Sequence, residues 1–295
     1  MRKASFAIIV GFVLLIVLAL MLTQSVAVLQ RVARVSEVKG APQIVATGQQ
    51  EAQPLGEMRL VQAGDKLITG GQGQLTLNWI DGTRIRLEPN TELLVEKCQV
   101  AQGAEYSSFR LDLGNVWIRV LKLLSQQDKF EIQTPTATAG VRGTIFAVEV
   151  ASDGATEIQV YEGEVKVESG GKQLRVAKNH TAQLGDSSGV SEVVGFSEED
   201  RQNWNQEIAQ LGPYLDITSP ENNAQFSGNV VTIKGRCERE AALMVNGQPV
   251  SQKFNGQFTA SLQVPAEEEY FTVQAVATDH RGYSTEVSRH LRRAQ

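Results

Sequence analysis

The stretch Val141-Arg142-Gly143-Thr144-Ile145-Phe146-Ala147-Val148-Glu149-Val150 decides the fold class of this chain. From Thr144 onward it consists mainly of apolar, small and β-branched residues, which is typical of a buried strand. Gly143 permits backbone conformations that are closed to other residues, and the five donors of Arg142 can satisfy several carbonyl groups where chain segments converge. The stretch therefore predicts a buried strand that is entered through a tight corner containing an arginine.

Short strand patterns continue on both sides of this stretch, from about Arg31 to Leu184. Turn pairs such as Asp81-Gly82 separate them and no helical pattern intervenes, which excludes a doubly wound α/β fold and favours an all-β sandwich, roll or short β-helix. The pattern Leu111-x-x-Gly114-x-Val116-x-Ile118 returns as Val160-x-x-Gly163-x-Val165-x-Val167, a hint of repetition. The predicted strands are Gln74–Trp79, Thr83–Leu87, Leu93–Lys97, Ser108–Leu113, Val116–Val120, Phe130–Gln133, Thr144–Val150, Thr156–Tyr161 and Glu164–Glu168.

One helix is predicted after the loop Ser187-Ser188-Gly189. Ser197 is suited to cap its N-terminus, acidic residues follow in the first turn, and Gly212-Pro213 ends it. Its apolar residues form a narrow stripe on one side: Trp204, Ile208 and Leu211. We interpret this segment as a helix that docks on a neighbour and serves as a hinge or spacer between two domains, with few contacts crossing it.

A second all-β unit is predicted from Tyr214 onward. Val230–Gly235 alternates apolar and polar residues, and Asn246-Gly247 is a strong signal for a type I′ hairpin. The number and spacing of the strands are typical of an immunoglobulin-like (Ig-like) sandwich. The run Val-Asn-Gly…Gly-Gln-Phe…Ala-x-Asp-x-x-Gly resembles the bacterial Ig-like modules, through its turn residues, and lacks the Cys…Trp…Cys pattern of antibody domains.

The N-terminus predicts a location outside the cytoplasm for most of the chain. Phe6–Leu22 contains no polar side chain, and a helix of that length rises about 26 Å, close to the thickness of the hydrocarbon core of a bilayer. Arg2 and Lys3 favour a cytoplasmic start. Ser25-Val26-Ala27 is a possible cleavage site, so the alternatives to an uncleaved anchor are a removed signal peptide, which would leave a secreted protein, and a buried core helix.

Composition and motifs point away from catalysis and from nucleic acids. The net charge of −5 opposes binding to phosphates. Gly-x-Ser-x-Gly, His-Glu-x-x-His and phosphate-loop motifs are missing, and the three histidines are scattered. We therefore predict no catalytic residue, no cofactor and no metal site. Cys98 and Cys237 are interpreted as free, buried strand residues. The tryptophans are interpreted as core or helix-docking residues, with a sugar site as the alternative: Trp79, Trp117 and Trp204.

Several motifs in a fixed order closely resemble the FecR domain, a module of the bacterial cell envelope. The resemblance extends from about Leu60 to Val167, and it includes Gly64–Thr69, Asp81–Leu87 and Gly114–Trp117. Its most specific residues, with a structural or a partner-binding role, are Thr134, Pro135, Val141, Arg142, Gly143, Thr144, Phe146 and Gly163. For Arg142 we favour a structural role, in which it binds backbone carbonyls of adjacent turns, over a place in a docking surface.

The resemblance implies a regulatory or binding role. The best-known members of the family are single-pass regulators that receive a signal from an outer-membrane iron–siderophore transporter and control an extracytoplasmic-function sigma factor through a cytoplasmic N-terminal segment. About five residues precede the predicted anchor here, so we expect no direct action on a sigma factor.

We accordingly predict an all-β chain with a FecR-type β-roll or short β-helix and an Ig-like sandwich, preceded by one transmembrane helix. The expected divisions are 1–23, a cytoplasmic stub and anchor; 24–190, the FecR-type domain; 191–213, a linker with the helix; and 214–295, the Ig-like domain. The expected function is that of a non-enzymatic binding or scaffold protein, anchored in the inner membrane and lying mostly in the periplasm. Its expected partners are envelope proteins or polysaccharides. The alternatives are a signal-transduction component of metal or siderophore uptake and a carbohydrate-binding accessory protein.

Overall fold

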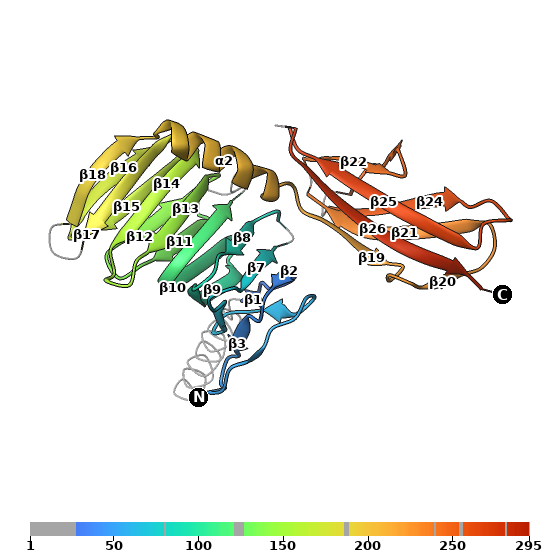
Figure 1. The fold of residues 1–295 in the computed structure, drawn as a ribbon, viewed down its shortest axis with the longest axis horizontal. Coiled ribbons are helices and arrows are strands. Elements are labelled where there is room, and N and C mark those ends of the chain that lie inside the picture. Colours follow the sequence, from blue (N-terminus) through green and yellow to red (C-terminus); the bar gives the residue numbers. More distant parts are fainter. Residues whose placement is uncertain are drawn as a thin grey trace, which may run out of the picture.

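The computed structural model describes residues 28–79, 81–120, 127–185, 189–238, 240–253, 256–280 and 282–294. Almost all secondary structure in these ranges is β-strand, and α2 (Glu198–Gln210) is the helix that they contain, which confirms the all-β prediction (Figure 1). The apolar run Phe6–Leu22 lies outside the described residues. Within them, no helix is long and apolar enough to cross a membrane.

The N-terminal strands form a closed hydrogen-bonded barrel. They are β1 (Leu29–Gln30), β2 (Ala33–Lys39), β3 (Gln43–Val45), β4 (Gln53–Pro54), β5 (Leu60–Val61), β6 (Lys66–Ile68), β7 (Gln74–Asn78), β8 (Arg84–Leu87), β9 (Glu92–Ala101), β10 (Ala104–Arg119), β11 (Lys129–Gln133), β12 (Thr138–Val141), β13 (Ile145–Val150), β14 (Thr156–Glu162), β15 (Glu164–Ser169), β16 (Lys172–Ala177), β17 (His180–Gly185) and β18 (Gly189–Gly195). β18 carries the barrel to Gly195, past the predicted boundary at 190.

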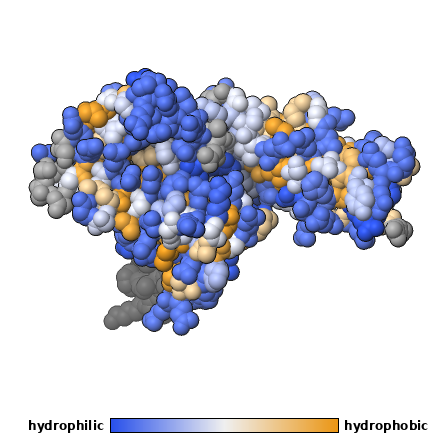
Figure 2. All heavy atoms as spheres, in the orientation of Figure 1, coloured by the Kyte–Doolittle hydropathy of each residue, from blue (hydrophilic) through white to orange (hydrophobic). Residues whose placement is uncertain are grey.

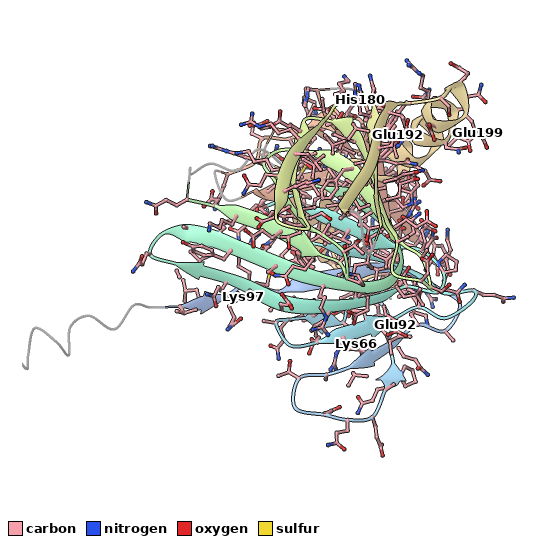
Figure 3. All side chains as sticks on the ribbon, turned by 90° about the vertical axis from the view of Figure 1, so that its left-hand side faces the viewer. Lys66, Glu92, Lys97, His180, Glu192 and Glu199 are labelled. Carbon is pink, nitrogen blue, oxygen red and sulfur yellow. The ribbon has the colours of Figure 1, made fainter. Side chains whose placement is uncertain are left out.

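Two sheets make up this barrel. Sheet A contains β6, β9, the first half of β10, β11, β12, β15 and β16, and sheet B contains β2, β7, β8, the second half of β10, β13, β14, β17 and β18. Apolar side chains from both sheets form one core, which includes Leu75, Phe109 and Phe146. The outer face of sheet A carries charged pairs such as Lys66 and Glu92, whose Nζ and Oε2 atoms lie 2.7 Å apart (Figure 3).

The strand β10 differs from the prediction, because it runs without a break where two strands, Ser108–Leu113 and Val116–Val120, were expected. Its first part pairs with β11 in sheet A, and Gly114–Arg119 pairs with β13 in sheet B. Gly114 lies between the two parts at φ +94°, and a Cβ atom there would come within 2.6 Å of the Asn90 carbonyl oxygen. Glycine therefore lets one strand turn the corner between the sheets.

A second corner has the same sequence pattern. Gly163, at φ +87°, separates β14 in sheet B from β15 in sheet A. The two related patterns found in the sequence thus mark places where the chain passes from one sheet to the other, in opposite directions.

The C-terminal strands form two further sheets. A three-stranded sheet has the order β19 (Leu215–Ser219), β21 (Val230–Cys237), β24 (Gln257–Gln263). A five-stranded sheet has the order β20 (Gln225–Phe226), β26 (Ser284–Arg293), β25 (Tyr270–Thr278), β22 (Ala242–Val245), β23 (Gln248–Pro249). Apolar residues from both sheets form a core of their own. We call residues 214–294 the C-terminal unit.

The helix α2 packs against the outer face of sheet B. Ser197 caps it, and Ser197 and Asp200 form a capping box. The stripe predicted from the sequence is buried, with Trp204 and Ile208 at 0% exposure and Leu211 at 1%, and it contacts Ile145 and Ala147 of sheet B. The outward side of α2 is hydrophilic (Figure 2). The docking prediction is confirmed, and the role of the segment as a hinge or spacer between two domains stays a prediction.

Candidate functional site

The motif residues Thr134 and Pro135 lie in a turn that precedes β12. The Ala137 N–H donates to Thr134 Oγ1 at 3.0 Å, and the Thr156 hydroxyl donates to the same oxygen at 2.9 Å. Thr136 in turn donates to Thr156 Oγ1 at 2.7 Å. Pro135 itself is exposed. These hydroxyl contacts join the turn before β12 to the turn before β14, an arrangement that stabilises this end of the barrel.

The other motif residues meet at a corner at the opposite end of β12. Gly143 has φ +68°, and a Cβ atom on Gly163 would lie 2.8 Å from the Gly143 carbonyl oxygen. The buried Thr144 hydroxyl donates to the Glu164 carbonyl at 3.1 Å. Phe146 lies in the barrel core. The structure therefore brings two corners of the chain into direct contact through residues that the sequence singled out.

Arg142 lies at this corner with an exposed side chain, next to the buried Val141. The structural role favoured for Arg142 from the sequence stays a prediction. Removing a surface arginine lowers the stability of a protein only slightly, because its contacts compete with water.

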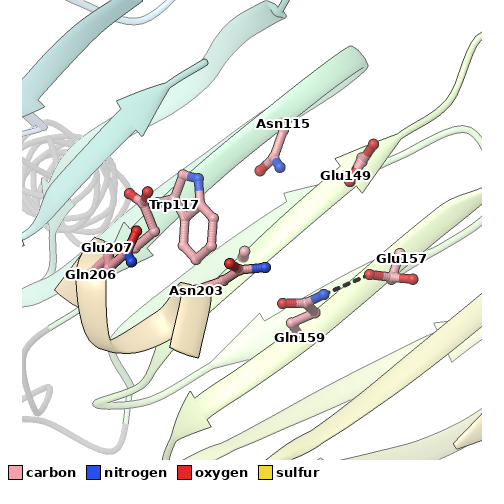
Figure 4. A pocket seen from close by; sticks show the side chains of 9 residues that line it. Asn115, Trp117, Glu149, Glu157, Gln159, Asn203, Gln206 and Glu207 are labelled. Atoms are coloured by element: carbon pink, nitrogen blue, oxygen red, sulfur yellow. Dashed lines mark hydrogen bonds between the residues drawn. The ribbon is translucent and has the colours of Figure 1, made fainter. Parts of the chain in front are cut away.

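A pocket of about 250 Å³ lies on the outer face of sheet B beside α2 (Figure 4). Strands β10, β13 and β14 form its floor, and α2 forms one wall. Its lining combines one indole ring, several side-chain amides and three carboxylates: Asn115, Trp117, Ala147, Glu149, Glu157, Gln159, Asn203, Gln206 and Glu207. The pocket is therefore polar and acidic.

Next to the pocket, a group of buried charges joins the barrel to the C-terminal unit. The guanidinium of Arg119, on β10, donates two hydrogen bonds to Glu238, with Nη1–Oε2 at 2.6 Å and Nη2–Oε1 at 2.7 Å. Their side chains are 1% and 3% exposed. Asp279 lies 3.5 Å from the same guanidinium. A bidentate pair so deeply buried fixes the relative position of the two groups.

Further contacts surround this pair. Arg34, on β2, binds Asp216 of the C-terminal unit at 2.7 Å, and Arg289 lies 3.7 Å from the same carboxylate. The hydroxyl groups of Tyr161 and Tyr283 lie 3.4 Å apart. The expectation that few contacts would cross the helix is therefore wrong, since the barrel and the C-terminal unit share a buried polar junction.

Burial at the junction shifts the pKa of two of its groups. It lowers the pKa of Arg84 to about 10, because the guanidinium is removed from water. It raises the pKa of Tyr214 to about 12, with help from the neighbouring Asp216 carboxylate. The junction thus holds an unusually buried set of charges.

The remaining candidates have structural positions. Trp79 lies in the barrel core, where its Nε1 donates to the sulfur of Cys98 at 3.0 Å. Trp204 packs in the helix interface, 4.5 Å from the ring centre of Trp117. Cys98 and Cys237 are free and buried, as expected. In the part of the chain that the structure describes, no group of three or more histidine, cysteine or acidic residues is placed to hold a metal.

The junction residues were missed by the sequence reasoning. Arg84 and Arg86 alternate with Ile85 and Leu87, a pattern that predicts an exposed charged face. They are buried because α2 and the C-terminal unit, more than a hundred residues later, cover that face. The burial of Arg84 and Arg86 could have been predicted only by considering them together with the polar residues near Glu238.

The fold is all-β, and the motif residues build its corners and turns. Residues 65–166 match the family model described as FecR protein, and the chain thus carries a FecR domain in its barrel. The match confirms the resemblance drawn from the motifs.

Solved structures similar to this chain include two crystal structures of a candidate anti-sigma factor from Parabacteroides distasonis. Both are 18% identical to it. They cover 51% and 50% of this chain, and the chain covers 67% and 65% of theirs, with TM-scores of 0.39 and 0.38. These scores are too low to carry an argument about function. No curated protein matches the chain.

Proposed function

We propose that this protein is a non-enzymatic, membrane-anchored FecR-domain protein that binds a partner outside the cytoplasm and takes part in signalling across the envelope. The FecR domain at 65–166 carries the proposal. The expected anchor, Phe6–Leu22, supports the location. The Ig-like character expected for the C-terminal unit belongs to the same proposal.

The buried junction adds a structural reason for a binding role. Because Arg119 and Glu238 fix the C-terminal unit against sheet B, both units present their surfaces in one orientation. A partner that touches both units would meet a preorganised surface, which lowers the entropic cost of binding.

The test combines location, capture and gene expression. A reporter fused after Gln295 should be active only outside the cytoplasm, and the chain should stay in membranes after carbonate extraction. Photo-crosslinkers at exposed positions such as Lys97 and Glu192 should capture one membrane or envelope protein reproducibly from intact cells (Figure 3).

Deletion of the gene then separates regulation from assembly. A regulator should change the transcript levels of a small, defined set of genes, and the full-length chain should restore them. Unchanged transcripts together with loss of a surface structure would contradict the signalling role and favour a scaffold.

A further inference from the structure

The two sheets of the barrel are joined through β10, and each of them ends in a strand that has a partner on one side only. In sheet A this last strand is β16, which pairs with β15, and in sheet B it is β18, which pairs with β17. Among the described residues, no strand pairs with the other side of either one. Figure 1 shows both strands at the end of the barrel that lies away from the C-terminal unit.

Apolar side chains of the core reach the surface at this end of the barrel. Val193, on β18, is the direct partner of the buried Ala182 and so faces the core, but it is 41% exposed. Leu174, on β16, faces the core beside Val167 and is only partly buried. Stacked β-structures need a cover on such an end, because water otherwise meets apolar surface. An added strand would supply that cover.

The free edge of β16 offers backbone groups for such a strand. β15 and β16 pair along their whole length without a bulge, and the two-residue turn Gly170-Gly171 joins them. In such a hairpin, alternate residues bond to the partner strand, beginning with those that flank the turn. The N–H and C=O groups of Gln173, Arg175 and Ala177 therefore point away from β15, where an added strand can bind them.

The charge of this edge indicates the kind of strand that it accepts. The segment from residue 172 to residue 178 contains Lys172, Arg175 and Lys178 and no carboxylate, in a chain with a net charge of −5. The Arg175 side chain is 68% exposed, and its ion pair with Glu164, at 3.5 Å, is a weak surface contact. A second copy of this edge is disfavoured, because like charges would face each other. A strand with carboxylates meets a complementary surface.

The surroundings of β16 agree with an acidic strand at this edge. Glu192 is the charged residue of β18, so the other free edge repels such a strand. On the outer face of sheet A, a groove of about 540 Å³ adjoins β16, and the direct partners Arg175 and Lys166 line it. The carboxylates of the groove, Glu131 and Glu168, belong to β11 and β15 and not to the edge strand.

We propose that β16 binds an extended, acidic segment of a partner protein, which adds a strand to sheet A. Carboxylates on the outward side of this segment face Arg175, and apolar residues on its inward side cover the open end of the core at Leu174 and Val193. Backbone hydrogen bonds hold the segment, and its side chains determine specificity. The proposal rests on the binding role proposed above, to which it adds the binding edge and the chemistry of the partner.

Calorimetric titration of the full-length chain, in a nonionic detergent, tests the charge and the strand with synthetic peptides. A peptide of four Glu-Val repeats should bind saturably, because an extended chain of this sequence has carboxylates on one side and apolar residues on the other. Four Lys-Val repeats reverse the charge, and four Glu-Pro repeats keep it but cannot pair as a strand. Both should bind at least tenfold more weakly.

Charge reversal at one residue tests the site. Arg175→Glu should weaken binding of the Glu-Val peptide at least tenfold. Lys97→Glu changes the net charge equally, at an exposed position on β9, and should change the affinity less than twofold. Both side chains are exposed, so the melting temperatures of the two variants should stay close to that of the wild type and show that weaker binding does not reflect unfolding.

Hydrogen exchange distinguishes an added strand from attraction between charges alone. The bound Glu-Val peptide should slow amide exchange within β16, because the N–H groups that face the free edge acquire acceptors. The proposal is overturned if this peptide gives no saturable heat, if the Lys-Val peptide binds as tightly, if folded Arg175→Glu binds like the wild type, or if the protection falls outside β16. Protection of β16 that appears without peptide and rises with protein concentration would show a second copy at this edge, and would also overturn the proposal. These outcomes concern a peptide in solution, so the location and the signalling role proposed above stand or fall separately.

Discussion

Gly143 and Gly163 are the residues on which the geometry of the FecR domain depends most directly. Both have positive φ values, and a Cβ atom on Gly163 would lie only 2.8 Å from the carbonyl oxygen of Gly143. A larger residue at either position would therefore strain its own backbone, and at Gly163 it would also separate the two corners.

We predict that Gly143→Val destabilises the chain by about 1–3 kcal/mol, because a β-branched residue must adopt φ +68°. Urea denaturation of the full-length chain measures the change in the free energy of unfolding. Arg142→Ala is the matched control, since its side chain is exposed, and it should change stability by less than about 0.5 kcal/mol. Wild-type stability of Gly143→Val would show that the corner can relax.

Alkaline pH should reveal the buried thiol of Cys237. Burial, assisted by Glu238, raises its pKa from the ordinary 9.0 to about 12. Between these values the folded chain holds a proton that the unfolded chain has lost, so stability falls as pH rises. Cys237→Ala should make this fall in stability shallower in urea denaturation between about pH 9 and 11.

Arg84, with its lowered pKa, makes stability rise with pH above about pH 10 in both proteins. Only the difference in stability between the two proteins therefore reports the thiol. Identical slopes would contradict the assignment.

At the scale of elements, α2 shows what the sequence can and cannot predict. Ser197, the acidic first turn and the apolar stripe located the helix correctly, because capping and periodicity are local properties. The strands on which it docks could not be predicted, because the residues that contact Trp204 are distant in sequence. The prediction of a break within β10 was wrong. Gly114 resembles a turn residue locally, but the strand pairs with its neighbours on both sides of this residue and therefore continues.

Ser197→Ala tests the helix alone. Loss of the cap should cost about 1 kcal/mol, because the Asp200 N–H loses its acceptor at 3.1 Å. Ser251→Ala, at an exposed position in the C-terminal unit, is the control and should leave the melting temperature unchanged. An equal loss in both variants would indicate that the cap contributes nothing of its own.

At the scale of the whole molecule, we expect the junction to make the barrel and the C-terminal unit unfold as one cooperative body, because buried ion pairs join them. The charges that join them come from β2 and β10 on one side and from the segments around Asp216, Glu238 and Asp279 on the other. No local pattern predicts such a junction, since each charge by itself is typical of a solvated strand face. The corners and cores could be predicted from spacing, whereas this interface depends on tertiary placement alone.

The last prediction follows from the burial of Arg119. Glu238→Ala leaves the Arg119 guanidinium with the more distant Gly212 carbonyl, at 3.4 Å, and Asp279 carboxylate, at 3.5 Å, and removing one member of a buried pair typically costs about 3–5 kcal/mol. Because that cost falls on the junction, calorimetry of the full-length chain should change from one unfolding transition to two, and the C-terminal unit should unfold separately.

Glu240→Ala, at a nearby exposed position, should keep the single transition. Arg119→Met combined with Glu238→Leu removes both members of the bidentate pair, and it should restore part of the coupling, because the buried guanidinium that lost Glu238 is then absent as well. A single transition at the wild-type temperature in Glu238→Ala would show that the units are joined by other contacts, such as those of Arg34 with Asp216.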